Sequence, residues 1–435
     1  MLERFCTWRE TRTLATPSEV QAYVRRHLRW NMGVGIVDAM FYQVAQQIMS
    51  NETVIPLLLS SLGASTVIIG LATALVSLGV LLPQLAMAGL TEGLRYKKPI
   101  SLLSGSIERA SFFLVGVALL LWGQTRPGFV LVLFLVLRTV GSISLGMILP
   151  AWSSMIGKVI PTRRRGQFFG IGRSLGALLG VGGAFLAGQL LQHWGFNGFA
   201  ACMMLGSAAT FVSWTGLALT REPPDLEVKP PTPLTSYLAR LPELVRKDRN
   251  YARFVLARTV GLLGSMATSF VIVDGARRFN LTGLQVGGLT ATIAITQTVM
   301  YLTWGLIADR YGHKAVLALC ALATGLGALL AGWTPVVWGL HLALALVGAA
   351  HGGEVISGSN LVLEFARPVD RPTYIGLTAT LLAPARTLAP VIGGALAGAL
   401  GFGPLFAIAT ALGCLGALML ATLVRDPRTT LADAD

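Results

Sequence analysis

Apolar segments of about twenty residues recur along the whole length of this 435-residue chain, and they constrain its fold more than any other feature. A helix needs about 20 mainly apolar residues to cross the roughly 30 Å hydrocarbon core of a bilayer. Twelve spans are predicted, with only short loops between them. They lie at about 32–58, 66–90, 99–122, 128–152, 167–191, 198–219, 251–273, 285–308, 314–333, 335–359, 374–399 and 402–424. The sequence therefore predicts an all-α membrane protein of twelve transmembrane helices.

Composition agrees with this interpretation. The chain is 54% hydrophobic and 12% charged, whereas about 25% of the residues in a soluble domain are charged. A net charge of +14 is also typical of nucleic-acid-binding proteins. Here the basic residues lie in short loops between apolar segments, so we expect a lipid bilayer and no nucleic acid as partner. The four cysteines form no CxxC pair, and we interpret them as small core residues rather than metal ligands.

Basic residues alternate between the two sides of the predicted bilayer. They cluster near both ends of the chain and after spans two, four, eight and ten, while the other loops have few. Because cytoplasmic loops carry an excess of Lys and Arg, a multi-pass protein of the cell inner membrane with both termini cytoplasmic is predicted. The basic loops contain Arg95, Lys97, Lys98, Arg163, Arg164, Arg165, Arg310, His313, Lys314, Arg367 and Arg371.

Two polar stretches set the predicted domain boundaries. Residues 221–250 are the one long interruption, rich in proline and then charged, as expected of a linker. Near the start, Ser18 to Trp30 can form an amphipathic helix on the membrane surface. The predicted division is a cytoplasmic segment 1–31 with this helix, a six-helix bundle 32–220, a cytoplasmic linker 221–250, a second bundle 251–425 and a cytoplasmic tail 426–435.

The two halves of the chain resemble each other. One gapless alignment pairs Val54 with Val271, Glu92 with Asp309, and Lys97 with Lys314. A second stretch pairs residues 165–170 with 371–376. Duplicated transporter halves place the solute pathway at the repeat interface near the bilayer midplane. We therefore expect two pseudo-symmetric six-helix bundles around a central cavity.

The loop between spans eight and nine has a specific motif. It reads Gly305-Leu-Ile-Ala-Asp309-Arg310-Tyr-Gly312-His-Lys314. This resembles the signature G-x-L-A-D-R-x-G-R-K of the major facilitator superfamily. The resemblance implies two bundles that rock about a central cavity, with Asp309 as a gating residue. Arg310 and Lys314 are expected to hold the turn at the cytoplasmic headgroups; a loop that merely follows charge statistics is the alternative.

The first-half copy of this loop departs from the signature. Glu92 keeps the acid, but Gly93 stands where the signature has Arg, which predicts the stronger latch in the second half. Span four resembles the drug–proton antiporter pattern L-x-x-x-R-x-x-x-G at Leu133, Arg138 and Gly141, with its glycine one residue early. The span-five antiporter pattern lacks its proline. These departures put drug export in doubt, and the direction of transport stays open.

Several ionisable residues fall within the predicted spans. An ionised side chain at mid-membrane costs roughly 2.5–3.5 kcal/mol on insertion scales, so each needs a partner or a wet cavity. The acids are Asp38, Glu52, Glu108 and Glu354, and the bases are Arg109, Arg138, Arg173, Arg258 and Arg386.

Span one contains the most informative group of polar residues. On a helix its polar residues fall within an arc of roughly 120°, which favours cavity lining over a buried structural network. The stripe comprises Asp38, Tyr42, Gln46, Met49, Glu52 and Thr53. Asp38 and Glu52 are the candidate proton carriers, with a structural pair as the alternative for Glu52. We expect Arg138 to be the partner of Asp38.

The other membrane charges leave alternatives open. His351 and Glu354 share a helix face and are candidates to bind substrate or relay protons, or His351 is an ordinary buried histidine. Arg386 and Arg173 are candidates to meet an anionic substrate, or they pair with Glu354 and Glu108 across helices. Adjacent Glu108 and Arg109 are not expected to pair, and Arg258 is expected to snorkel.

These features favour a transporter. No GxxxxGK[ST] motif and no nucleophile–base constellation occurs, so neither an ATP-driven pump nor an enzyme is expected, and no cofactor or metal. We predict a monomeric secondary active transporter of a small organic solute that works by alternating access, coupled to protons. The alternatives are an organic-anion uniporter, symporter or exchanger, and a non-transporting receptor or scaffold.

Overall fold

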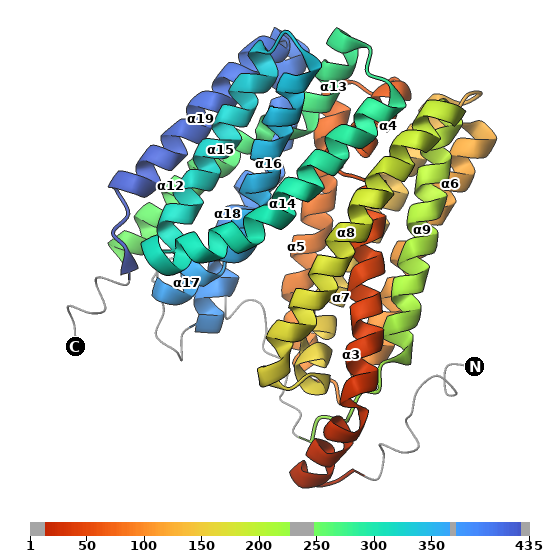
Figure 1. Ribbon diagram of the computed structural model, residues 1–435, viewed down its shortest axis with the longest axis vertical. Coiled ribbons are helices and arrows are strands. Elements are labelled where there is room, and N and C mark those ends of the chain that lie inside the picture. Colours follow the sequence, from red (N-terminus) through yellow and green to blue (C-terminus); the bar gives the residue numbers. More distant parts are fainter. Residues whose placement is uncertain (1–13, 227–247, 366–370, 428–435) are drawn as a thin grey trace. The chain divides into compact units, whose positions relative to one another are not determined.

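A computed structural model describes residues 14–226, 248–365 and 371–427, and in these ranges the regular structure is helical (Figure 1). In the described parts of the chain, eleven helices are long and apolar enough to cross a membrane. In the first half the helices are α3 (Pro17–Ile48), α4 (Val54–Ser61), α5 (Thr66–Glu92), α6 (Lys98–Trp122), α7 (Pro127–Val159), α8 (Thr162–Trp194) and α9 (Phe196–Leu219).

The second half repeats the pattern with more interruptions. Its helices are α12 (Arg249–Leu263), the 3₁₀ turn η1 (Gly264–Ala267), α13 (Thr268–Phe279), α14 (Gly283–Tyr311), α15 (His313–Trp333), α16 (Val337–Ser357), α17 (Asn360–Phe365), α18 (Arg371–Leu400) and α19 (Phe402–Thr422). Together with the first predicted span, the apolar helices give the twelve-helix, two-bundle fold that the sequence predicted.

The first predicted span differs from the others in two ways. Its polar residues lower its hydropathy, so α3 is not among the eleven apolar helices. The helix also ends at Ile48 and resumes as α4 at Val54. Ser50 Oγ lies 3.2 Å from the Glu52 carboxylate and accepts from the Glu52 N–H at 3.3 Å, a local arrangement that competes with helix. The predicted continuous stripe from Asp38 to Glu52 is therefore wrong at its end.

The predicted amphipathic helix is the first part of α3. A capping box starts it: Thr16 Oγ1 accepts from the Glu19 N–H, and the Glu19 carboxylate accepts from the N–H groups of Ala15 and Thr16. These backbone donors lower the pKa of Glu19. The helix then continues without a break into the membrane span. The short helix predicted in the linker lies outside the described residues.

The chain divides into two compact units. The first comprises Met1–Met49, Leu78–Gly183 and Phe196–Leu234, and the second comprises Ser50–Ser77, Ala184–Gly195 and Thr235–Asp435. In the first unit α3 packs along α9, and α6 packs against α7 and α9 (Figure 1). In the second, α15 packs between α16 and α19. One end each of α5 and α8 therefore belongs to the second unit.

Large apolar side chains on the outside of the helices fit a lipid environment. Leu302 is 72% exposed and Leu178 is 71% exposed, values that would be unfavourable in water over so many helices. Trp333 and Trp338 are still more exposed and flank the turn between α15 and α16. Exposed tryptophans at helix ends are typical of the membrane–water interface.

Close glycine contacts join helices inside the second unit. A Cβ on Gly70 of α5 would overlap the Pro390 carbonyl of α18, and one on Gly394 would overlap the Thr66 carbonyl. Thr66 Oγ1 also donates to the Gly394 carbonyl at 2.7 Å. The ends of α8 and α14 meet in the same way. We call this set the glycine seam: Gly70, Gly188, Gly287 and Gly394.

A pair of asparagine clamps reveals the duplication in three dimensions. The Asn31 amide accepts from the Arg221 N–H at 2.9 Å and donates to the Arg221 carbonyl at 3.1 Å. The Asn250 amide binds the backbone of Arg425 identically, at 2.8 and 3.0 Å. Each clamp ties the first helix of a half to the end of its sixth.

The two clamps give a stability prediction. Asn31 is 2% exposed, so Asn31→Ala leaves a backbone N–H and C=O without partners in a buried place. We expect a loss of about 1–3 kcal/mol in the free energy of unfolding. Asn250→Ala should cost less, because its hydrogen bonds are exposed and water can replace the amide. Thermal unfolding in detergent measures both, with exposed Asn197→Ala as the control; equal stability of Asn31→Ala and wild type would contradict the clamp.

Candidate functional site

Four helices of the first unit bring polar side chains together. Asp38 on α3 is 8% exposed, and its carboxylate accepts two hydrogen bonds. Ser213 Oγ on α9 donates to Oδ1 at 2.6 Å, and Trp152 Nε1 on α7 donates to Oδ2 at 3.0 Å. Both donors are neutral. The Asp38 carboxylate is therefore stabilised by dipoles rather than by a direct ion pair.

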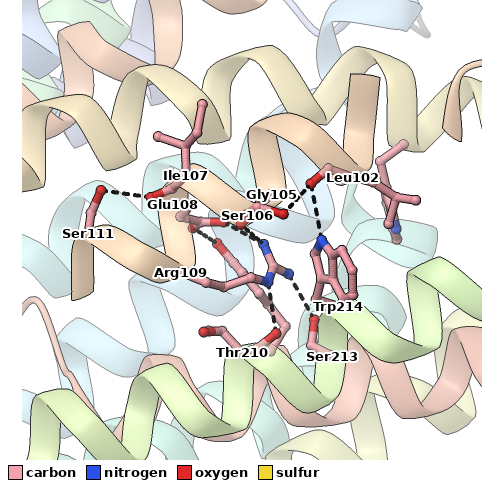
Figure 2. Close-up of polar contacts among 12 residues, drawn as sticks. Leu102, Gly105, Ser106, Ile107, Glu108, Arg109, Ser111, Thr210, Ser213 and Trp214 are labelled. Carbon is pink, nitrogen blue, oxygen red and sulfur yellow. Dashed lines mark hydrogen bonds and ion pairs between the residues drawn. The ribbon is translucent and has the colours of Figure 1, made fainter. Parts of the chain in front are cut away.

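Arg109 lies on the other side of Ser213 and is almost fully bonded (Figure 2). Its guanidinium donates to Ser213 Oγ at 3.2 Å, to the Glu108 carboxylate at 3.1 Å, and to two backbone carbonyls. These carbonyls belong to Thr210, at 2.8 Å, and Gly105, at 3.0 Å. The Ser213 hydroxyl thus links the guanidinium to the Asp38 carboxylate.

Glu108 completes this network, and it corrects one expectation. Tyr42 OH donates to Glu108 Oε1 at 3.1 Å, while Oε2 faces Arg109. The prediction that adjacent Glu108 and Arg109 do not pair was wrong, because their long side chains bend back along α6 and meet. We call Asp38, Ser213, Arg109, Glu108 and Tyr42 the carboxylate network; of its two acids, Glu108 contacts the Arg109 guanidinium directly and Asp38 reaches it through Ser213.

A cavity of about 240 Å³ adjoins the carboxylate network. Trp152 and Phe169 form an aromatic wall, with ring centroids 6.2 Å apart. The Arg173 guanidinium carbon lies 5.9 Å from the Phe169 centroid, so a cation also borders this space. The polar lining residues are Asp38, Tyr42, Gln43, Glu108, Arg109 and Arg173. The cavity offers charged, hydrogen-bonding and aromatic surfaces to a small organic molecule.

Three predicted residues do not line this cavity. The Arg138 guanidinium is buried and lies 4.8 Å from the Phe112 centroid, and the hydrogen bonds of Asp38 go to Ser213 and Trp152 rather than to Arg138. Gln46 is half-buried further along α3. Glu52 lies in the turn after α3, bonded to Ser50. The expected pairing of Asp38 with Arg138 is therefore replaced by a link through Ser213 to Arg109.

The second unit holds a separate charge cluster. Arg258 Nη2 donates to both Glu354 oxygens, at 2.5 and 2.6 Å, and Arg386 Nη2 donates to Oε1 at 2.9 Å. Arg258 is 4% exposed, so the expectation that it snorkels was wrong. The buried Arg258 guanidinium is compensated by its ion pair with the Glu354 carboxylate. The alternative in which Arg386 pairs with Glu354 across helices is the arrangement observed.

A cavity of about 240 Å³ borders this cluster too. His351 lines it together with Glu354, on the helix face that their spacing predicted. Hydroxyl groups of α13, α15 and η1 contribute further polar atoms. The polar lining residues are Arg258, Ser265, Thr268, Thr324, His351, Glu354 and Arg386. Two guanidiniums against one carboxylate leave this cavity with an excess positive charge.

The predicted gating loop is a tight turn between α14 and α15. Gly312 has φ 90° and ψ 156°, a conformation that favours glycine, and it ends one helix and caps the next. Asp309 and Arg310 are exposed, and the Arg310 guanidinium stacks 5.3 Å from the Tyr311 ring. Lys314 Nζ donates to the carbonyls of Ala421 and Val424.

The structure adds further details of this loop. Lys314 binds carbonyls at and just beyond the end of α19, because helix ends leave carbonyls without intrahelical partners. Gly305 lies within α14, and a Cβ there would meet nothing within 4 Å. Glu92 is the last residue of α5, and its side chain is not among those described.

The first half also contains a charged clasp that was not predicted from the sequence. The Glu222 carboxylate accepts from the N–H groups of Lys97 and Lys98, each at 2.8 Å, and pairs with Lys158 Nζ at 2.5 Å. Asp225 pairs with Lys97 Nζ at 2.6 Å. The available signal was the acidic sequence that follows span six, Arg221-Glu-Pro-Pro-Asp225, beside the basic loop before α6.

No group of three or more His, Cys, Asp or Glu side chains in the described parts of the chain is placed to hold a metal ion. Within the described residues Cys202, Cys320 and Cys414 form no disulfide, and Cys6 lies outside those residues. The chemistry of both cavities is therefore that of carboxylates, guanidiniums, hydroxyls and aromatic rings.

A family model described as Major Facilitator Superfamily matches residues 39–275 and 254–434. An uncharacterized MFS-type transporter of Methanocaldococcus jannaschii is 25% identical over 189 residues, which are 42% of this chain and 47% of that protein. The rubrofusarin-specific efflux pump of Gibberella zeae is 30% identical over 118 residues, 27% of this chain and 21% of the pump. The chain thus spans less than half the length of these curated relatives.

Solved structures with the same fold cover nearly the whole chain. The nucleoside transporter NupG has a TM-score of 0.69 at 14% identity, over 90% of this chain and 99% of that one. The xylose transporter XylE from E. coli has a TM-score of 0.63 at 13% identity, over 93% and 97%. The human organic anion transporter MFSD10 has a TM-score of 0.58 at 19% identity, over 90% and 99%. These likenesses show the fold.

Proposed function

Because this chain belongs to the major facilitator superfamily, we propose that it is a proton-coupled secondary transporter that moves a small organic solute by alternating access. The family and the fold point to a transporter rather than an enzyme. Coupling to protons is proposed from the carboxylate network of the first unit.

The state of Asp38 is the observation that supports proton coupling most directly. Its carboxylate is buried at membrane depth and faces a cavity, yet its two hydrogen bonds come from neutral donors. A buried carboxylate without a direct cation gains much from protonation, since burial disfavours the charged form. Glu108, by contrast, pairs directly with Arg109. We assign proton binding to Asp38 and the role of fixed counter-charge to the Glu108–Arg109 pair.

The location, the topology and the moving parts are proposed from the loop charges and from the internal repeat. We infer an inner-membrane location with both termini cytoplasmic, since the basic loops lie on one predicted side. The bundles 32–220 and 251–425 are proposed as the moving parts, and a monomer as the working form. The carboxylate network in one half and the Glu354 cluster in the other give each half its own polar site.

A second substrate class is favoured by the positive cavity of the second unit. Arg386 is 41% exposed at its side chain and uses one nitrogen for Glu354, which leaves other N–H donors toward the cavity. Arg–carboxylate pairs are well suited to bidentate recognition. We therefore propose an organic anion, carried by symport or exchange, as the alternative substrate to a neutral or cationic solute. His351 borders the same space.

A flux assay in proteoliposomes tests both parts of this proposal. An imposed difference of one pH unit sustains about tenfold accumulation of a solute that exchanges or moves with one proton. We expect one of three probes, a nucleoside, a sugar or an aromatic carboxylate, to follow the gradient. Empty liposomes and a collapsed gradient are the controls. Flux of every probe that ignores the gradient refutes proton coupling, and absence of all flux favours a scaffold.

A further inference from the structure

A groove of about 280 Å³ on the first unit is lined by residues of α3 and α9. These two helices run side by side (Figure 1). The groove is separate from the cavity of the carboxylate network, and no residue lines both. The lining residues are Arg29, Trp30, Gly33, Val34, Val37, Thr215, Gly216 and Leu219. Most of this lining is apolar, and the two side chains at one end are an arginine and a tryptophan.

Glycine gives the groove its shape. A Cβ on Gly33 would meet nothing within 4 Å, so this residue forms a notch in the surface of α3. At Gly216 the two helices touch, because a Cβ there would lie 2.5 Å from the Val34 carbonyl. At the other end, Trp30 Nε1 donates to the Leu219 carbonyl at 2.9 Å. The groove is thus an open slot bounded by a helix contact and by an indole ring.

Basic residues surround the tryptophan end. Arg25 and Arg29 are exposed and stand one turn apart on α3, on the helix row that continues to Gly33 and Val37. The Arg221 guanidinium carbon lies 5.2 Å from the Trp30 ring. The sequence of α9 contains no acidic residue, and the next acid along the chain, Glu222, is held by Lys158. This end of the groove therefore has a positive charge.

We propose that the groove binds an anionic glycerophospholipid of the surrounding bilayer. The phosphate lies at Arg25 and Arg29, and one acyl chain follows the apolar wall past Gly33 to Val37. Basic residues near a membrane surface attract anionic lipids, and tryptophan is favoured at headgroup level. A zwitterionic lipid offers the same acyl chain without the net negative charge, so the arginines select against it.

Native mass spectrometry of the full-length protein in detergent tests this site. Phosphatidylglycerol and phosphatidylcholine are added at matched concentrations, and bound lipid is counted. Gly33→Leu fills the notch, and we expect binding of phosphatidylglycerol about tenfold weaker, as when about two methylenes lose their burial. Arg29→Gln should weaken it about fivefold. The matched controls are Gly128→Leu, another glycine whose Cβ meets nothing, and Arg163→Gln, an exposed arginine of α8 that does not line the groove.

The lipid-binding results either support the site or overturn it. Preferential binding of phosphatidylglycerol that falls in Gly33→Leu and Arg29→Gln, but not in the controls, supports the site. Equal binding of the two lipids, or equal losses in the control variants, overturns it. If Gly33→Leu does not remain monodisperse, Arg29→Gln decides alone, since an exposed arginine is removed without a change in packing. The measurement needs no transport, so it is independent of the proposed function.

Discussion

Replacing Asp38 by Asn is expected to abolish accumulation of the solute in response to a pH gradient. With one pH unit imposed, wild type should concentrate its solute about tenfold at one proton per solute, whereas the variant should reach only equal concentrations on both sides. The reason is that asparagine keeps the size of the side chain but cannot bind and release a proton. Solute accumulation in proteoliposomes, measured at equal protein density, checks this.

Two further variants make the test specific to the proton. Ser213→Ala removes the hydroxyl between Asp38 and Arg109 but leaves the carboxylate, so accumulation should persist. Glu108→Gln alters the fixed counter-charge and should reduce the rate. Asp38→Asn is expected to fold, because the Ser213 hydroxyl can reorient toward the new amide. An Asp38→Asn protein that still concentrates the solute about tenfold would contradict the assignment of Asp38.

The membrane helices were predictable because the amino-acid composition of each segment by itself indicates a span. About twenty apolar residues between basic or proline-containing loops predict a span, whatever that span packs against. The break between α3 and α4 was not predictable in this way. It depends on the Ser50–Glu52 hydrogen bonds and on the separate packing of α4 in the second unit, neither of which alters the apolar pattern.

The candidate sites were predictable only in part. The census of buried charges correctly indicated that partners must exist, and the spacing of His351 and Glu354 placed both on one face because they share a helix. The partners themselves depend on how helices rotate against each other. Asp38 and Ser213 lie 175 positions apart, and Arg258 and Glu354 lie 96 apart, so no local pattern could pair them.

The asparagine clamps illustrate a signal that was present but weak. Arg221 and Arg425 are each followed by an acid and a proline, at the ends of the sixth and twelfth spans. This short repeat lies outside the two alignments that revealed the duplication. Its meaning becomes clear only when Asn31 and Asn250 are seen to bind the two backbones in the same way.

A bulky side chain in the glycine seam is expected to slow transport strongly. Alternating access requires helix contacts that close in one state and separate in another, and the seam joins α5 and α8 to α18 and α14 through backbone contacts that only glycine permits. In Gly394→Leu the side chain would overlap the Thr66 carbonyl. Overpacking costs about 1–3 kcal/mol, so the closed seam should become about 5- to 150-fold less populated.

Flux in proteoliposomes should therefore fall by about the same factor in Gly394→Leu, and by less in Gly394→Ala. Gly376→Leu is the matched control, because Gly376 lies on the same helix, α18, and a Cβ there would meet nothing within 4 Å. It should transport normally. Thermal unfolding in detergent separates a changed conformational balance from misfolding, since the former leaves a cooperative transition. Wild-type flux in Gly394→Leu would mean that this seam does not have to close during transport.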